Sequence, residues 1–349
     1  MIDVGLIGFG LGGKAFHAPV ITAVDGLRLA AVLQRHENTA AQTYPGVKIV
    51  RSVEELLAVP SIRLVAISTP NDTHYAYVKA CLEAGRDVVV DKPFTTTFAE
   101  AKELAELARK RGRLLTVYQE RRLDGDFLTL KKLIAEGALG RLVHYESTFD
   151  RCRAVVRDSW KEKPGAGCGV FFDLAPHLID DALVLFGPPE SLLADIRNER
   201  DRAINSDAFD LTFYYPQGFR ATISANTLAP VPRAHFSVRG TRAEFIKHNL
   251  DPQEALLRAG QKMEGESWGL EKEADYGTLY EIDDARVTPR KIPTLRGDYR
   301  AYYANVRDAL LGRAKPDVTL EDALRVMYAL ELAEQSSAAR QILPWKLSL

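Results

Sequence analysis

The sequence is poor in cysteine and in net charge. It has three cysteines among 349 residues, Cys81, Cys152 and Cys168, and no two of them form a CxxC pair. We therefore expect free structural thiols and neither a disulfide framework nor a zinc site. The 46 lysines and arginines nearly balance the 47 aspartates and glutamates, so the formal net charge is -1. A chain without a basic field is not expected to bind nucleic acid.

Long apolar runs are also missing. Met1 leads directly into a strand-like segment without the charged and apolar regions of a secretory signal, and no later run is long enough to span a bilayer. No polybasic segment points to a membrane surface either. We therefore expect a cytoplasmic protein that acts on a small soluble molecule. The length of the chain favours two domains over a single core.

In the first third of the chain, short aliphatic strands alternate with helical patterns. Helices are expected to begin at Ser52 and to cover 71–83 and 97–110, the last two ending at Gly85 and Gly112. Alternation of this kind predicts an α/β Rossmann domain, a doubly wound parallel sheet, over residues 1–120. Beyond the first strand at 2–7, the expected strands are 27–33, 64–68, 87–90 and 114–117.

After residue 120 the pattern changes to alternating apolar and polar residues. This predicts an α+β domain over residues 121–349 with a large, open, mainly antiparallel sheet. An open sheet face is expected to be covered by another copy of the chain, giving a homodimer or homotetramer. Residues 248–297 are rich in loop signals and are not assigned. The expected strands are 141–150, 207–215, 218–227 and 234–245, and the last helices are 300–311 and 320–340.

A glycine motif follows the first strand and opens a helix. Such a turn lets the backbone approach a pyrophosphate, which then lies at the helix N-terminus. The sequence therefore predicts a dinucleotide site, in the structural context that this motif requires. The residues of the motif are Gly8, Phe9, Gly10, Leu11, Gly12 and Gly13.

The end of the second strand bears on the choice between NAD and NADP. An NAD enzyme commonly has an acidic residue there for the ribose hydroxyls, whereas this strand ends in Gln34-Arg35-His36. The planar guanidinium of Arg35 suits a 2′-phosphate, which favours NADP. In the alternative, Arg35 is a solvated surface residue and Glu37 reaches back to the ribose of NAD.

Two further motifs follow strands of the same domain, where the ligands of an open α/β sheet bind. The first is Thr69-Pro70-Asn71-Asp72-Thr73-His74, in which His74 is expected to contact the cofactor or the backbone. The second is Asp91-Lys92-Pro93, in which the Lys92 ammonium could polarise a substrate oxygen beside the nicotinamide. The alternative for Lys92 is a lysine that extends to solvent at a strand end.

A glycine-rich segment at 165–169 leads into a helix that contains Asp173 and His177. Residues four apart share one helix face, so the carboxylate could set the tautomer and raise the basicity of the imidazole for acid–base catalysis. The alternative is an N-terminal carboxylate that stabilises the helix dipole, together with a core histidine. No GxSxG turn indicates a hydrolase, and no HExxH spacing indicates a metal site.

Together these motifs resemble the Gfo/Idh/MocA family of NAD(P)-dependent oxidoreductases, and the resemblance covers nearly the whole chain. It implies that Lys92 positions cofactor and substrate and that Asp173 and His177 are catalytic. Three further segments, 16–19, 119–130 and 250–254, resemble a branch that contains NADP-dependent scyllo-inositol dehydrogenases. The residues at Glu120, Leu123 and Cys152 depart from the usual pattern, which leaves the exact substrate open.

The resemblance implies oxidation of a secondary alcohol of a cyclic polyol or sugar, with His177 moving the proton and Lys92 holding the reacting oxygen. Tyr118, Arg153 and Trp160 are candidate substrate residues, and His17 is expected either to face the pocket or to pack in the core. Two alternatives use the same fold: an NADP-binding sensor that regulates a partner, and a redox-assisted glycosidase. Lys92, Asp173 and His177 are all present, which favours catalysis over the sensor.

Overall fold

The computed structural model describes residues 1–284 and 286–348. They divide into two compact units whose segments interleave along the chain. Gln253–Trp268 and Asp298–Leu324 pack with the first unit, whereas the sequence placed every residue from 121 onward in the second domain. The first unit consists of Met1–Glu120 and these two segments, and the second of Arg121–Pro252, Gly269–Gly297 and the residues from Arg325 onward.

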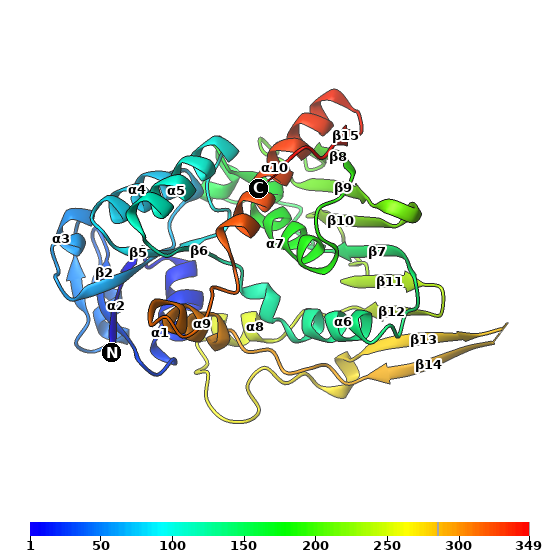
Figure 1. The fold of residues 1–349 in the computed structure, drawn as a ribbon, viewed down its shortest axis with the longest axis horizontal. Coiled ribbons are helices and arrows are strands. Elements are labelled where there is room, and N and C mark those ends of the chain that lie inside the picture. Colours follow the sequence, from blue (N-terminus) through cyan, green and yellow to red (C-terminus); the bar gives the residue numbers. More distant parts are fainter. Residues whose placement is uncertain (285, 349) are drawn as a thin grey trace. The chain divides into compact units, whose positions relative to one another are not determined.

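The first unit contains a six-stranded parallel sheet with the strand order β3-β2-β1-β4-β5-β6. Helix α1 lies on one face of this sheet, and α4 and α5 lie on the other (Figure 1). The predicted doubly wound sheet is confirmed. Its elements are β1 (Ile2–Ile7), α1 (Ala18–Thr22), β2 (Leu27–Leu33), α2 (Thr39–Thr43), β3 (Lys48–Val50), α3 (Val53–Leu57), β4 (Ile62–Ile67), α4 (His74–Glu83), β5 (Asp87–Asp91), α5 (Phe98–Arg111) and β6 (Leu115–Tyr118).

Local sequence signals account for these elements. All six residues of β1 are buried, as expected for a central strand covered on both faces. Thr97 caps α5 by accepting a hydrogen bond from the Glu100 backbone, and Gly112 ends the helix in the left-handed conformation. The expected cap of α3 is also present, because the Ser52 side chain accepts a hydrogen bond from the Glu55 backbone.

Two later helices, α8 (Gln253–Arg258) and α9 (Arg300–Leu310), belong to the first unit. Tyr302 and Tyr303 of α9 are buried with their ring centroids 4.8 and 5.7 Å from that of Tyr118. The Tyr302 hydroxyl donates a hydrogen bond to the Val117 carbonyl oxygen at 2.8 Å. This aromatic cluster explains why a segment nearly two hundred residues away packs beside β6.

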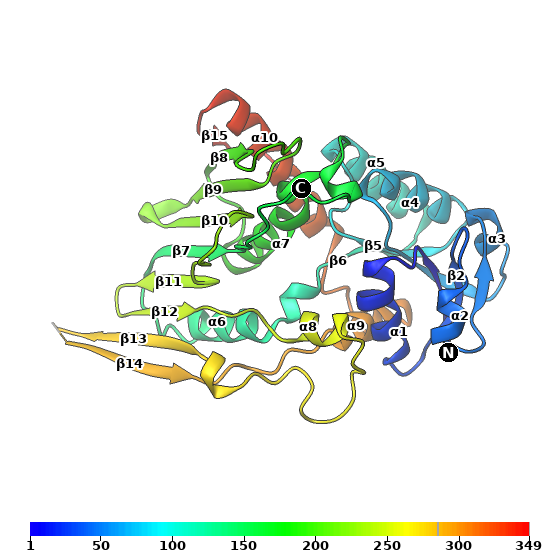
Figure 2. The same cartoon turned by 180° about the vertical axis from the view of Figure 1, so that it is seen from behind.

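The second unit contains a nine-stranded sheet with the order β14-β13-β12-β11-β7-β10-β9-β8-β15. Strands β7 and β10 pair in parallel and the other neighbours are antiparallel, which confirms the predicted sheet. Helix α7 (Gly169–Phe186) packs on β10 and β9, and α6 (Gly125–Ala135) lies on the same face (Figure 2). The strands are β7 (Leu142–Thr148), β8 (Ser191–Arg197), β9 (Ala208–Tyr214), β10 (Arg220–Asn226), β11 (Phe236–Gly240), β12 (Ala243–Lys247), β13 (Gly277–Asp283), β14 (Arg286–Ile292) and β15 (Leu343–Pro344); helix α10 is Leu320–Ala339.

Some strands differ from the sequence expectation. The segment 234–245 was expected to form one strand, but it turns at Thr241 and Arg242 into the hairpin of β11 and β12. The unassigned region 248–297 contains α8 and the hairpin of β13 and β14. In β14 every residue before Ile292 is exposed and Pro289 interrupts the run, so the strand lacks the alternation that sequence reading relies on.

A buried carboxyl group lies beneath the second sheet. Asp126, near the start of α6, is 1 % exposed, and its Oδ2 lies 3.7 Å from Nε2 of His235. His235 donates through Nδ1 to the Thr148 carbonyl oxygen, so Nε2 of the neutral ring can only accept. Burial raises the pKa of Asp126 and lowers the pKa of His235 to about 3. A protonated Asp126 facing a neutral His235 satisfies both observations.

The raised pKa of Asp126 makes stability depend on pH. The folded state retains a proton that an unfolded aspartate loses near pH of about 3.9, so the free energy of unfolding decreases as pH rises above that value. In Asp126→Asn this contribution is absent, and we expect a flatter profile. Urea unfolding of both proteins between about pH 4 and 7 measures the difference. Parallel profiles would show that Asp126 is ionised in the folded protein.

Candidate functional site

The glycine turn lies at the carboxyl end of β1. Gly8 has a φ of +94°, and a Cβ there would lie 2.3 Å from the Ser68 carbonyl oxygen. A Cβ at Gly13 would lie 2.2 Å from the Gly8 carbonyl oxygen, so a side chain fits at neither position. At Gly10 a Cβ would meet no heavy atom within 4 Å. The open space beside Gly10 suits the close approach of ligand phosphates that the motif predicts.

Lys92 follows β5, the neighbour of β4 in the sheet. The carboxylate of Asp91 accepts hydrogen bonds from the Lys92 backbone nitrogen at 2.9 Å and from the Ser68 hydroxyl at 3.1 Å. Burial raises the pKa of Asp91, but the interactions of its carboxylate with His17 and Lys92 outweigh this effect and lower the pKa to about 2. An anionic carboxylate therefore binds the backbone of Lys92, the lysine predicted from the sequence to be functional.

His74 joins two strand-end loops. Its ring is fully buried, with Nδ1 2.8 Å from the Pro93 carbonyl oxygen and Nε2 3.1 Å from the Thr69 carbonyl oxygen. Burial lowers the pKa of His74, so the neutral ring donates to one carbonyl, and the shorter contact assigns that bond to Pro93. Of the two contacts expected for His74, the structure places it on the backbone. Its ring packs between the Thr69 loop and the Lys92 loop.

The end of β2 presents a basic side chain. Gln34 is buried and uses its amide locally, donating to the Thr39 hydroxyl and accepting from the Ala40 backbone, both at 2.8 Å. The guanidinium of Arg35 donates to the Tyr77 hydroxyl of α4 at 3.0 Å. Tyr77 thus orients Arg35 at the carboxyl edge of the sheet, where the sequence predicts a 2′-phosphate.

Asp173 and His177 both lie in α7 of the second unit, one helical turn apart, as predicted. The helix continues through Pro176. The Asp173 carboxylate accepts a hydrogen bond from the Lys161 ammonium at 2.5 Å and lies 3.7 Å from the Arg151 guanidinium. Two cations therefore surround a carboxylate that was expected to act on His177, and His177 itself is buried.

The remaining acids of α7 have different environments. Asp180 forms a bidentate ion pair with Arg122, with both N–O distances 2.6 Å. Asp181 is buried, and burial raises its pKa well above the usual range. Among the described residues, no group of three or more His, Cys, Asp or Glu side chains is arranged to hold a metal ion. None of the helices described is long and apolar enough to cross a membrane.

The three substrate candidates occupy different environments. Tyr118 is buried, and its hydroxyl donates to the Phe16 carbonyl oxygen at 3.0 Å, which gives it a packing role in the first unit. Arg153 is partly exposed in the second unit, and its backbone nitrogen donates to the Thr227 carbonyl oxygen. Trp160 is 37 % exposed, with the Lys161 ammonium 5.6 Å from its ring centroid. Contact of these residues with a substrate stays a prediction.

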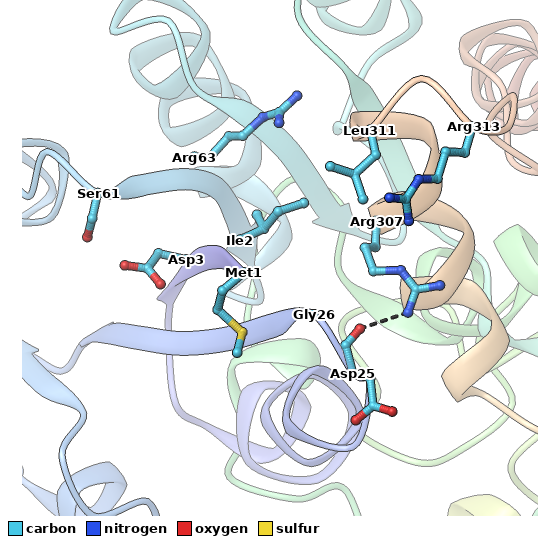
Figure 3. Close-up of a pocket in the computed structure, with 10 residues that line it drawn as sticks. All are labelled: Met1, Ile2, Asp3, Asp25, Gly26, Ser61, Arg63, Arg307, Leu311 and Arg313. Carbon is cyan, nitrogen blue, oxygen red and sulfur yellow. Dashed lines mark hydrogen bonds between the residues drawn. The ribbon is translucent and has the colours of Figure 1, made fainter.

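A depression of about 690 Å³ lies at the amino edge of the first sheet, where β1 and β4 begin (Figure 3). The Arg307 guanidinium donates there to the Asp25 carbonyl oxygen at 2.7 Å. Because the glycine turn follows the carboxyl end of β1, this depression lies at the opposite edge of the sheet from the expected dinucleotide site. Its lining residues are Met1, Ile2, Asp3, Asp25, Gly26, Ser61, Arg63, Arg307, Leu311 and Arg313.

Sequence reasoning missed several residues that contact the candidate site residues or hold their loops. Arg51, after β3, donates to the backbone carbonyl oxygens of Gln34 and Glu37 and so holds the loop that bears Arg35. Lys161 contacts Asp173 from the short 3₁₀ helix Trp160–Glu162, which has no recognisable sequence pattern. Tyr303 contacts His17 across 286 positions of sequence. For Asp91 a sequence signal did exist, because it directly precedes Lys92 in the motif Asp91-Lys92-Pro93.

Comparisons with known proteins agree with this architecture. Residues 2–119 match the family model described as the oxidoreductase family with an NAD-binding Rossmann fold, and residues 131–347 match its C-terminal alpha/beta domain. Oxidoreductase YdgJ of Escherichia coli K12 is 43% identical over 342 residues, 98% of each chain. The scyllo-inositol 2-dehydrogenase (NADP(+)) IolW of Bacillus subtilis is 35% identical over 340 residues, 97% of this chain and 95% of its own.

Solved structures show the same fold. The oxidoreductase yvaA of Bacillus subtilis superimposes with a TM-score of 0.95 at 34% identity, covering 99% of this chain and 98% of its own. The oxidoreductase YPO2259 of Yersinia pestis gives a TM-score of 0.93 at 40% identity, covering 100% and 98%. The two family matches, these relatives and the glycine turn of the first unit lead to one conclusion: the chain belongs to the Gfo/Idh/MocA family of NAD(P)-binding oxidoreductases.

Proposed function

We propose that the protein is an NADP-dependent dehydrogenase that transfers hydride between NADP and a secondary alcohol of a cyclic polyol or sugar. The observation that carries this proposal is the carboxyl edge of the first sheet, where a glycine turn and Lys92 occur with an arginine in place of a carboxylate after β2. The name of the relative IolW supports both the NADP dependence and an inositol-like substrate.

The residues of the first unit fit the cofactor. Gly10 leaves room for a diphosphate beside the backbone, and Arg35, oriented by Tyr77, offers a planar donor to a 2′-phosphate. We assign the loop of Thr69, Pro70 and Asn71, which lies against the His74 ring, to the nucleoside end of the cofactor. When bound, NADP supplies the hydride acceptor or donor of the reaction.

The residues that the family motifs single out take the remaining roles. His177 takes the hydroxyl proton during oxidation and returns it during reduction. Asp173, held by Lys161 and Arg151, orients the imidazole and stabilises its charged form. Lys92 donates a hydrogen bond to the reacting oxygen and stabilises negative charge that develops there. We assign Arg153 and Trp160 to substrate binding.

The role of His177 is tested by His177→Asn. If His177 is the general base, kcat falls by about two to four orders of magnitude, because the hydroxyl proton has no positioned acceptor. The affinity for NADPH should stay unchanged, since the glycine turn is intact. The assay follows reduced nicotinamide by absorbance with a panel of inositols, aldoses and aldonolactones.

His248→Asn is the matched control, because His248 is an exposed residue after β12 in the second unit, outside the proposed machinery. It should retain wild-type turnover. Near-normal turnover in His177→Asn would reject the base assignment. Tight NADP binding without turnover of any panel member by the wild type would favour the sensor, and cleavage of a glycoside would favour the redox-assisted glycosidase.

Cofactor preference is tested by Arg35→Ala. Loss of a charge-assisted contact of about 1.5–3 kcal/mol should weaken NADPH binding by about 10- to 100-fold and leave NADH binding nearly unchanged. Fluorescence titration of the binary complexes measures both constants. Arg113→Ala, which removes an exposed arginine after α5, is the matched control. Equal loss of affinity for the two nucleotides in Arg35→Ala would contradict recognition of the 2′-phosphate.

We also propose that the protein forms a homodimer or homotetramer through the open face of the second sheet. Helices α6 and α7 cover one face of this sheet, and on the other face half-buried side chains such as His144, Thr212 and Thr222 alternate along β7, β9 and β10. This face is polar as well as apolar, and it includes a depression of about 370 Å³ bordered by Arg197 and Arg233.

A charge placed on this face tests the assembly. Thr222→Glu should lower the mass measured by light scattering, because a buried unpaired carboxylate opposes association. Thr43→Glu, on the exposed surface of α2 in the first unit, should leave the mass unchanged. A monomeric wild-type protein at all concentrations measured would contradict the proposal.

A further inference from the structure

His17 belongs to an unusual turn directly after the glycine motif. Residues Gly13–His17 form a π-helical turn before α1. Such turns are rare and occur frequently at functional sites. The turn brings the His17 ring into the core of the first unit, where its exposed fraction is 0 %. A buried imidazole requires polar partners, because burial without them is costly.

The partners of His17 come from two distant segments. Its Nδ1 lies 2.7 Å from the Tyr303 hydroxyl, and its Nε2 lies 3.6 Å from Oδ2 of Asp91. An ionised carboxylate can only accept, so Nε2 carries the hydrogen that points to Asp91. Nδ1 of that tautomer accepts the hydroxyl hydrogen of Tyr303. In this arrangement Tyr303 donates to Nδ1 of His17, and the Nε2–H of His17 faces the Asp91 carboxylate 3.6 Å away.

Neighbouring aromatic residues hold the ring in this orientation. The Tyr118 ring lies against His17, with a centroid distance of 4.5 Å, and the Tyr303 centroid is 6.1 Å away. The Tyr118 hydroxyl also donates to the carbonyl oxygen of Phe16, the residue before His17. The Tyr118 hydroxyl therefore holds the backbone of the turn, and the Tyr303 hydroxyl holds the ring.

Asp91 connects this turn with Lys92. Its Oδ2 lies 3.1 Å from the position that a Cβ of Gly12 would occupy, directly beside the glycine turn. The same carboxylate binds the Lys92 backbone nitrogen through Oδ1 and the Ser68 hydroxyl through Oδ2. A displacement of Asp91 would therefore disturb both the glycine turn and the loop that bears Lys92.

The order of hydroxyl, imidazole and carboxylate resembles a hydrolytic triad, but the burial of its members excludes that chemistry. Tyr303 and His17 are both fully buried, so no substrate reaches the hydroxyl. A role in core packing alone would not require a donor aimed at Asp91, because an apolar ring would fill the same space without the cost of burying polar groups.

We propose that His17 is a positioning residue that, with Tyr303, holds the Asp91 carboxylate and so fixes Lys92 relative to the glycine turn. The kinetic test of this inference rests on the proposed function, because it needs a substrate. The tests by NADPH binding and by NMR need no substrate. Tyr118 supports the same arrangement through its contact with the ring.

The adjacent tyrosines of α9 provide a matched pair of variants. Tyr303→Phe removes the hydroxyl that contacts His17, and Tyr302→Phe removes a similarly buried hydroxyl that contacts Val117 and Thr116. We expect Tyr303→Phe to weaken NADPH binding about tenfold and to lower the rate of hydride transfer more than it changes KM. Tyr302→Phe should leave both constants near the wild-type values. Melting temperatures of the ligand-free variants record any general loss of stability.

Substitution of His17 itself tests the contact with Asp91. His17→Phe should weaken NADPH binding at least as much as Tyr303→Phe, and His17→Gln should restore part of the affinity because its amide can donate to Asp91. A double-mutant cycle of His17→Phe with Asp91→Asn should be strongly non-additive. The ring ¹⁵N signals of His17 in the ligand-free protein should show a single tautomer with the hydrogen on Nε2.

The outcomes separate this inference from the proposed function. If the two tyrosine variants change NADPH affinity alike, or if His17 shows the other tautomer, His17 is a core residue and the inference fails. If the binding and NMR results are as expected but no polyol or sugar is turned over, the positioning role stands and the proposed substrate class fails.

Discussion

The first unit depends on the half-buried carboxylate of Asp91. A parallel sheet brings the carboxyl ends of its strands to one edge, so Asp91 of β5 lies beside Ser68 after β4 and the glycine turn after β1. The aspartate accepts hydrogen bonds from the Ser68 hydroxyl and the Lys92 backbone nitrogen, and Nε2 of His17 lies 3.6 Å from its Oδ2. The low pKa of Asp91 shows that these interactions outweigh the cost of burying a charge. The glycine turn and the loop of Lys92 thereby lie against one shared carboxylate.

In the second unit, the long helix α7 carries several acidic side chains whose electrostatic environments differ. Asp173 lies between Lys161 and Arg151, and Asp180 is held by Arg122 in two short hydrogen bonds. Asp181, by contrast, is buried with a raised pKa. Neighbouring carboxyl groups on one helix thus have different environments because their partners differ, and two cations hold Asp173 one turn before His177.

Regular local patterns made most of the architecture predictable. Strand–helix alternation defined the parallel sheet, and the caps at Ser52, Thr97 and Gly112 marked helix ends within a few residues. The pattern failed where burial is one-sided or absent. The exposed strand β14 and the hairpin turn after β11 follow from pairing with neighbouring strands, which no local period encodes. The return of α9 to the first unit follows from aromatic contacts with Tyr118.

The sequence by itself determined the glycine turn, the lysine after β5 and the spacing of Asp173 and His177, because each is a local pattern with a fixed geometry. Only the tertiary structure decided which side chains serve them. Arg35 is oriented by Tyr77, Asp173 is held by Lys161, and His17 is placed between Asp91 and Tyr303. These partners lie between 12 and 286 positions apart in the chain. Their meeting depends on the path of the folded backbone, and sequence spacing carries no information about it.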